Sequence, residues 1–305
     1  MMIEANLKFI TPCFCAGANP LEAEIRAPSI RGELRWWFRC LGGKKRDEDA
    51  VFGSVAGSGN ASALQVRIFS VIRSETVYSP PHAKLEDHGA YLHFFLDRPP
   101  KNGRSRLWGN PPDPKSRKKG IPRPEGCFPP GSTFQLRIRS VRKISESAQP
   151  ILDLAIRATL RFGSIGFRQT RGFGAWAWMD EPIIVGDLDR LTNEIEGVAP
   201  GFRFWIAPNA ANHPDGLLNQ VETKLKAMRK PEDDNSPALP AKKLTALGHS
   251  GEHGRQASAV RFRPVQIQTR KGETQYKLVV FQAPDGVLGP DVIEPKRIVP
   301  DLIPK

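Results

Sequence analysis

The chain contains few cysteines and no long apolar run. Its 305 residues include four cysteines at irregular spacing, too few for a disulfide framework. No stretch approaches the roughly 20 apolar residues that a membrane-spanning helix needs. The first residues also lack the basic-then-apolar layout of a secretory signal peptide. We therefore expect a reduced, cytoplasmic protein with no membrane contact.

Groups that could carry out catalysis or bind a metal are also scarce. His249 and His253 have metal-like spacing, but no second ligand pair lies near them in the sequence. Cys13 and Cys15 form a Cys-x-Cys pair, which is not a zinc knuckle. His93 lies in an apolar run and is expected to be a hydrogen-bonded core residue. No Gly-Lys-Ser/Thr motif and no nucleophile-with-base arrangement occurs. The sequence therefore predicts no catalytic residue, no metal and no cofactor.

Positive charge, in contrast, is abundant and unevenly distributed. Lys plus Arg total 45 and Asp plus Glu total 32, which gives a formal charge of +13. Residues 26–46 hold seven basic residues against one acid, and residues 101–123 hold eight against one. Acids gather at 180–196 and 232–234 instead. This pattern predicts a basic face and a polyanionic partner, with nucleic acid favoured over a membrane surface.

An amphipathic helix is expected from about Ser29, a candidate N-cap, to Gly42–Gly43. Its apolar face consists of residues at three- and four-residue steps, namely Ile30, Leu34, Trp37, Phe38 and Leu41. Arg31, Arg35 and Arg39 form a second row, which rises about 6 Å per step. The planar guanidinium group of arginine can donate two parallel hydrogen bonds to a phosphate. This arginine row therefore predicts contact with RNA or DNA. The alternative is a solvated face that pairs with nearby acids.

Two further features of the motif segments allow alternative interpretations. Trp36 lies off the apolar face, where it either stacks on a base or fills a domain interface. The glycine loop 163–174 brings backbone amides and two arginines together, which favours phosphate contact. Its alternative is a plain helix-to-strand connector. A helix precedes this loop and a strand follows it, so it is not a nucleotide-cofactor fingerprint.

The order of elements indicates an α+β fold with antiparallel sheets. Expected strands and helices follow the sequence strand, helix, strand, strand, helix, strand, which is the ferredoxin-like (RRM-like) arrangement. The expected strands are 3–9, 64–71, 134–138 and 175–179, with 91–96 as a further candidate, and the second helix is 150–162. We take 1–181 as an N-terminal domain with a basic insertion at 98–130.

The second half, 182–305, is expected to be a second, incomplete ferredoxin-like domain with an extended tail from Pro284. Its expected elements are a strand at 202–206, a helix at 217–228, and a hairpin of 260–268 with 276–282. A polar break is expected at 231–240.

The segment Ile25–Arg39 resembles the signature of the first subunit of the Cmr complex, a family within the RAMP superfamily of type III-B CRISPR effectors. Three further segments resemble that family in the same order along the chain, namely Val51–Ser54, the glycine loop 163–174 and the strand Ala259–Val265. The resemblance implies tandem ferredoxin-like units with a glycine loop beside bound RNA. It also implies a non-catalytic subunit at the head of a ribonucleoprotein, with guide RNA, target RNA and other RAMP subunits of the Cmr complex as partners.

From the motif match and the basic stretches we predict a set of RNA-binding residues. They are Arg31, Arg35, Trp36, Arg39, Lys44, Lys45, Ser54, Arg168, Arg171, Gly172, Phe173, Gly174, Arg261 and Arg263. The competing hypothesis is a RAMP-superfamily endoribonuclease that processes guide RNA with a histidine base.

Overall fold

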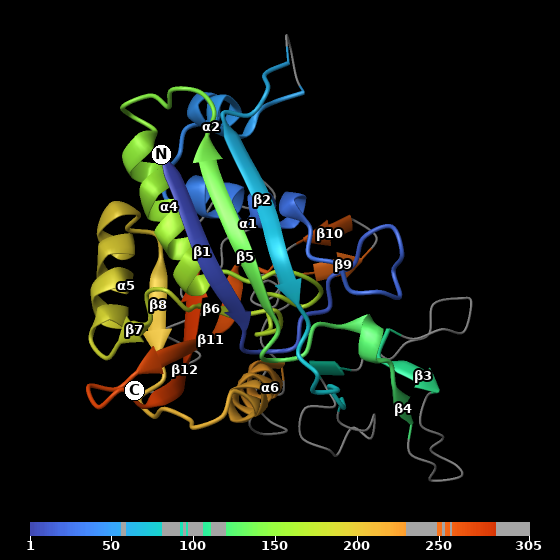
Figure 1. Cartoon of the computed structure of the whole chain (residues 1–305). Coiled ribbons are helices and arrows are strands. Elements are labelled where there is room, and N and C mark those ends of the chain that lie inside the picture. The colour runs from blue at the N-terminus through green and yellow to red at the C-terminus, as the bar shows by residue number, and fades with distance from the viewer. Residues whose placement is uncertain are drawn as a thin grey trace.

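The computed structural model of the chain (Figure 1) describes residues 1–55, 59–80, 92–93, 96, 106–110, 120–229, 249–251, 254–256 and 258–284. The predicted polar break at 231–240, most of the basic stretch 101–123 and the tail beyond Pro284 lie outside the described residues. Within the described residues, no helix is long and apolar enough to cross a membrane. The four cysteines are buried and form no disulfide.

The first sheet confirms the predicted ferredoxin-like order. Its elements along the chain are β1 (Met2–Phe9), α1 (Ala27–Cys40), β2 (Leu64–Ile72), β5 (Thr133–Ser140), α4 (Gln149–Phe162) and β6 (Trp176–Trp178). The strands lie in the order β2-β5-β1-β6, and each neighbouring pair is antiparallel. Alternate residues of β1 and β5 are buried, which is the period expected of strands with one face against a core.

Helix α1 starts three residues earlier than expected. Pro28 occupies its first turn, where the fixed φ suits a helix and the missing N–H costs nothing. Arg26 is the N-cap residue and makes no side-chain capping bond, so Ser29 is not the cap. Beyond the helix, Gly42 has φ +87° and turns the chain. A helix that the sequence did not indicate follows at once, α2 (Lys45–Phe52).

The second sheet differs from the predicted second ferredoxin-like unit. Its elements are β7 (Ile183–Ile184), α5 (Asp187–Val198), β8 (Arg203–Ile206), α6 (Asp215–Arg229), β11 (Val260–Gln268) and β12 (Thr274–Gln282). The strand order is β7-β11-β12-β8, and β7 pairs with β11 in parallel, so the sheet is mixed. The expected 260–282 hairpin is confirmed, with Thr269 and Glu273 closing its turn.

Smaller elements lie outside both sheets. They are the pairs β3 (Trp108–Asn110) with β4 (Ile121–Pro122) and β9 (His249–Gly251) with β10 (Gly254–Gln256), and the short 3-10 helix η1 (Pro124–Gly126). The expected strand at 91–96 is wrong, because Leu92, His93 and Leu96 are helical. A short apolar run does not by itself separate a buried strand from a buried helix. His93 is buried as expected, 2.6 Å from the Tyr78 hydroxyl.

Helices α1 and α4 pack against both sheets. One core cluster contains Leu136 of the first sheet, Trp37 of α1 and Phe281 of the second sheet. The Trp37 ring lies 5.6 Å from the Phe202 ring and 5.3 Å from the Phe281 ring. The predicted boundary at 181/182 falls between β6 and β7, and the core continues across it.

Candidate nucleic-acid interface

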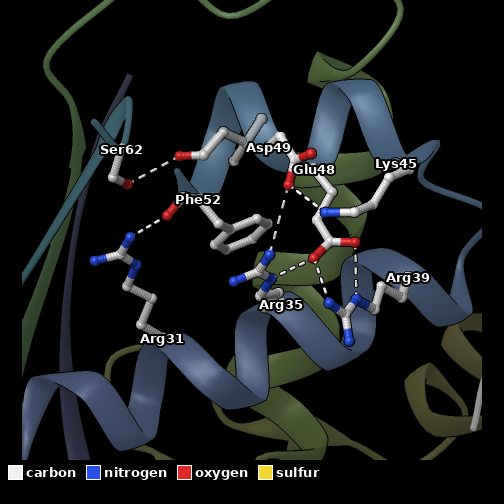
Figure 2. Close-up of polar contacts among 9 residues, drawn as sticks. Arg31, Arg35, Arg39, Lys45, Glu48, Asp49, Phe52 and Ser62 are labelled. Carbon is white, nitrogen blue, oxygen red and sulfur yellow. Dashed lines mark hydrogen bonds and ion pairs between the residues drawn. The ribbon is translucent and has the colours of Figure 1, made fainter. Parts of the chain in front are cut away.

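The arginine row of α1 faces helix α2, and each of its three arginines has an acceptor there (Figure 2). Arg31 donates to the main-chain carbonyl of Phe52. Arg35 donates to Glu48 and lies 3.7 Å from Asp49. Arg39 donates to both oxygens of Glu48, at 2.8 and 2.6 Å. The alternative of a face that pairs with nearby acids therefore describes the isolated chain better than an open row.

Glu48 is the centre of this network. Its side chain is only 3% exposed, and burial opposes its charge. The hydrogen bonds from Arg39 and Arg35 outweigh that burial, so the pKa of Glu48 lies below its usual value. The same contact raises the pKa of Arg39. We call Glu48 and the two arginines the α1–α2 clamp.

The clamp leaves part of its positive charge at the surface. The Arg35 and Arg39 side chains are 32% and 46% exposed. Arg39 uses Nε and Nη2 for Glu48, and its Nη1 has no hydrogen-bond partner within the described ranges. Lys44 and Lys45 are exposed at the start of α2, and Lys45 pairs with Asp49. This end of the molecule can therefore still accept an anion.

Trp36 fills an interface, which was one of the two alternatives for this residue. Its ring lies 6.2 Å from that of Phe281 and 6.4 Å from that of Phe202. The Arg261 guanidinium covers it at 3.4 Å. Arg261 also donates to Glu33 of α1 at 2.6 Å, and both side chains are nearly inaccessible, at 5% and 2%. This ion pair joins α1 to the second sheet.

Arg263 lies on the same face of β11, two residues further on. It is fully buried and donates from Nη1 to the Gln169 carbonyl at 2.8 Å. Burial lowers its pKa to about 9. Arg261 and Arg263 were predicted to contact RNA, whereas in this structure they are closed to an external ligand and hold the protein together.

The glycine loop packs along β11 and along the segment after β1. Its backbone groups bond within the protein, since the Gly174 N–H donates to the Pro12 carbonyl and the Gly172 carbonyl accepts from the Thr11 hydroxyl. A Cβ on Gly174 would lie 1.9 Å from the Ile165 carbonyl oxygen. Phe173 is fully buried, with its ring 5.5 Å from that of Phe14. Gly172, Phe173 and Gly174 are therefore packing residues here, which is the connector alternative.

The exposed part of the loop is its tip. Phe167 is 40% exposed, and Arg168 is half-buried with an unusual φ of +57°. Arg171 is 8% exposed and forms a β-bridge with Phe262 of β11. Of the predicted charged loop residues, Arg168 is thus more exposed than Arg171. Ser54, predicted from the turn after α2, is half-buried and bridges to Asn60.

The structure therefore brings all four motif segments together through contacts within the chain. Arg31 contacts Phe52, Arg261 contacts Glu33, and Arg263 contacts Gln169. Sequence reasoning missed Glu48, although a signal was present in the acidic run Asp47–Asp49 directly after the basic stretch. It also missed the basic positions of the first sheet, Lys8, Arg67, Arg137 and Arg139, which alternate with buried or half-buried apolar residues. No cluster of three His, Cys, Asp or Glu side chains suited to a metal occurs in the described part of the chain.

Comparison with known proteins defines the class. The family model of the RAMP superfamily matches residues 6–176, more than half of the chain. The chain therefore belongs to the RAMP superfamily, as its motifs suggested.

Within that superfamily the chain is similar to Cmr1 proteins of Pyrococcus furiosus. It is 27% identical to CRISPR system Cmr subunit Cmr1-1 over 165 residues, which cover 50% of this chain and 40% of Cmr1-1. It is 26% identical to Cmr1-2 over 184 residues, which cover 56% of this chain and 91% of Cmr1-2. The match thus spans less than half of Cmr1-1. The crystal structure of Cmr1 from Pyrococcus furiosus (apo form) matches with a TM-score of 0.56 at 19% identity, over 98% of this chain and 92% of that one. The fold is therefore that of Cmr1.

Proposed function

We propose that this protein is a non-catalytic, RNA-binding subunit of a type III-B CRISPR (Cmr) effector complex. It acts at the head of the complex, where it contacts the 3′ region of the guide, the target RNA, or both, alongside other RAMP subunits. The observation that carries the proposal is the likeness to Cmr1 over nearly the whole fold, together with two distant Cmr1 relatives in sequence. The formal charge of +13 supports a polyanionic partner.

The contacts of this proposal are those predicted residues that reach the surface. They are the exposed parts of Arg35 and Arg39, with Lys44, Lys45 and Arg168. RNA phosphates are the ligand that these residues suit, because guanidinium and ammonium groups donate charge-assisted hydrogen bonds to phosphate oxygens. Such contacts do not depend on the base sequence of the RNA. Glu48 fixes the orientation of the Arg35 and Arg39 guanidinium groups. Arg39 donates to Glu48 from Nε and Nη2, which leaves the N–H groups of Nη1 for a phosphate.

RNA binding by the purified chain tests the first half of the proposal. We expect single-stranded RNA to bind with an affinity that falls as salt rises. Arg39→Ala should weaken binding and reduce the salt slope by about 0.7, the value for one phosphate contact on a single strand. Arg190→Ala is the matched control, because Arg190 also lies on a helix and pairs with an acid, Asp187. Equal losses in both variants would show that the effect is one of total charge.

Reconstitution tests the second half. The chain, co-expressed with the Cmr subunits of its own genome and guide RNA, should co-purify in a stoichiometric complex. Intact repeat RNA should remain uncut by the chain alone. Metal-independent cleavage that a His→Ala substitution abolishes would instead favour the guide-processing endoribonuclease.

A further inference from the structure

Among the residues that the structure describes, no helix or strand covers the face of the first sheet that points away from α1 and α4. In Figure 1, strands β1, β5 and β2 lie in front of these helices, and this face is turned toward the viewer. Burial alternates along the strands, so register identifies the residues of the open sheet face. They include Glu4, Asn6 and Lys8 of β1, Gln135, Arg137 and Arg139 of β5, and Gln65, Arg67 and Phe69 of β2.

This open sheet face is basic. Lys8, Arg67, Arg137 and Arg139 are cationic, and the opposing acid in the strands is Glu4, which pairs with Arg137 at 2.5 Å. Asp180, just after β6, is engaged by Asn6 and by Trp178. Arg67 and Arg139 are exposed and have no ion-pair partner among the described residues. These two arginines differ from those of the α1–α2 clamp, which are already hydrogen-bonded to Glu48.

The register adds a repulsion that an anion would relieve. Arg67 lies directly opposite Arg137 in the β2–β5 pair, and like charges in that position destabilise a sheet. Arg139 follows Arg137 on the same face, about 7 Å along the strand. This step is comparable to the phosphate spacing of an extended single strand. The open sheet face therefore holds three guanidinium groups at a spacing that suits one polyanion.

An aromatic side chain lies within the same group. Phe69 is half-exposed, and the Arg137 guanidinium lies 4.8 Å from its ring centre. Aromatic rings on an open four-stranded sheet are a recurring platform for stacked bases. A ring beside cations favours nucleic acid over an acidic peptide, because a peptide offers charge but no base to stack.

We propose that the open sheet face is a second RNA-binding surface, on which phosphates of a single strand contact Arg67, Arg137 and Arg139 and a base stacks on Phe69. The proposal rests on the proposed function in that the ligand is RNA, but it adds a site that none of the predicted RNA contacts includes.

Paired variants test the site. Arg67→Gln/Arg139→Gln removes two exposed charges and keeps side-chain length, and Arg190→Gln/Arg270→Gln is the control with the same charge change at exposed positions elsewhere. We expect the first double variant to bind single-stranded oligonucleotide RNA at least about tenfold more weakly and to lower the salt slope by about 1.4, with a smaller change in the control. Phe69→Leu should weaken binding about tenfold with an unchanged slope. Ultraviolet cross-linking of RNA to wild-type protein should label peptides from 64–72.

The outcomes separate the two proposals. If wild type binds no RNA, both proposals fail. If wild type binds RNA and Arg39→Ala weakens it, while both sheet variants match the control, the proposed function survives and the open sheet face is not an RNA site. If the sheet variants bind RNA normally but lose co-assembly with other subunits, the face is a protein interface and the RNA proposal is overturned. Phe69→Leu leaves charge unchanged and provides a second measure if the double variant folds poorly.

Discussion

The arginines of α1 and those of the open sheet face form an instructive contrast. The α1 arginines repeat every four residues, which made them the most conspicuous cations in the sequence, and each of them has an acceptor on α2. The sheet arginines occupy ordinary polar positions of alternating strands, and two of the three have no acid partner among the described residues. Regular spacing therefore reports the geometry of a helix. Availability to a ligand depends on what the neighbouring element carries.

The buried arginines have the least access to a ligand of all. Removing the acid partner of one of them should give the largest effect on stability. Glu33→Ala leaves Arg261 as an unpaired charge between α1 and the second sheet, and we expect a loss of about 3 to 5 kcal/mol in the free energy of unfolding. Glu194→Ala breaks an exposed pair with Arg157 and should cost about 1 kcal/mol or less. Urea denaturation measures both. Similar losses would mean that burial does not distinguish these pairs.

The glycine loop should behave as a packing element rather than as a phosphate cradle. Gly174→Ala places a Cβ against the Ile165 carbonyl at φ +64°, so we expect about 2 to 3 kcal/mol of destabilisation. Gly272→Ala, at φ +82° with open space around it, should cost about 1 kcal/mol. Thermal unfolding compares the two. A Gly174→Ala protein of normal stability that has lost RNA affinity would restore the phosphate-cradle interpretation.

Removal of one acid from each region compares the two arginine groups directly. Glu48→Gln releases Arg35 and Arg39, and Glu4→Gln releases Arg137. Each change removes one negative charge near a proposed phosphate path, so RNA should bind about three- to tenfold more tightly at low salt. The increase in RNA affinity should be larger for Glu48→Gln, because two guanidinium groups lose their acid partner instead of one. Fluorescence anisotropy measures both affinities, and weaker binding by Glu48→Gln would show that the clamp is needed to orient its arginines.

The smallest expected effect is the pH dependence of the clamp. The pKa of Glu48 is lowered in the folded protein, against the burial that opposes its charge, by hydrogen bonds from Arg39 and Arg35. Its contribution is therefore fully present above the unfolded glutamate pKa of about 4.3 and is lost as pH falls through the lower folded value. The stability difference between wild type and Glu48→Gln should be about 1 kcal/mol at pH 7 and should shrink below pH 4. Denaturation at several pH values measures it, and a constant difference would exclude ionisation as its cause.

Much of the first sheet was predictable because its signals are local. The alternation in β1 and β5 and the three- and four-residue steps in α1 and α4 follow from periodicity alone. The faces that they assign to Leu34, Trp37 and Phe134 are buried as expected. The second sheet was less predictable, since the parallel pairing of the two-residue strand β7 with β11 depends on contacts distant in sequence.

The site was less predictable for the same reason. Whether Arg261 reaches RNA or Glu33 is decided by a contact across 228 residues. Whether Arg39 is open depends on α2, which begins six residues after it. The motif segments located the region where the chain converges, and tertiary packing decided which side chains face inward.

Helices α1 and α4 contact both sheets, and this arrangement has a mechanical consequence. A layer anchored on two sides resists bending, so the two halves should move as one stiff body, and the backbone amides of α1 should exchange with deuterium among the slowest. A force that displaces the first sheet would be passed through Trp36 and Trp37 to the hairpin of β11 and β12. The chain forms two sheets one after the other, yet under an applied force the two sheets should move together as one rigid unit.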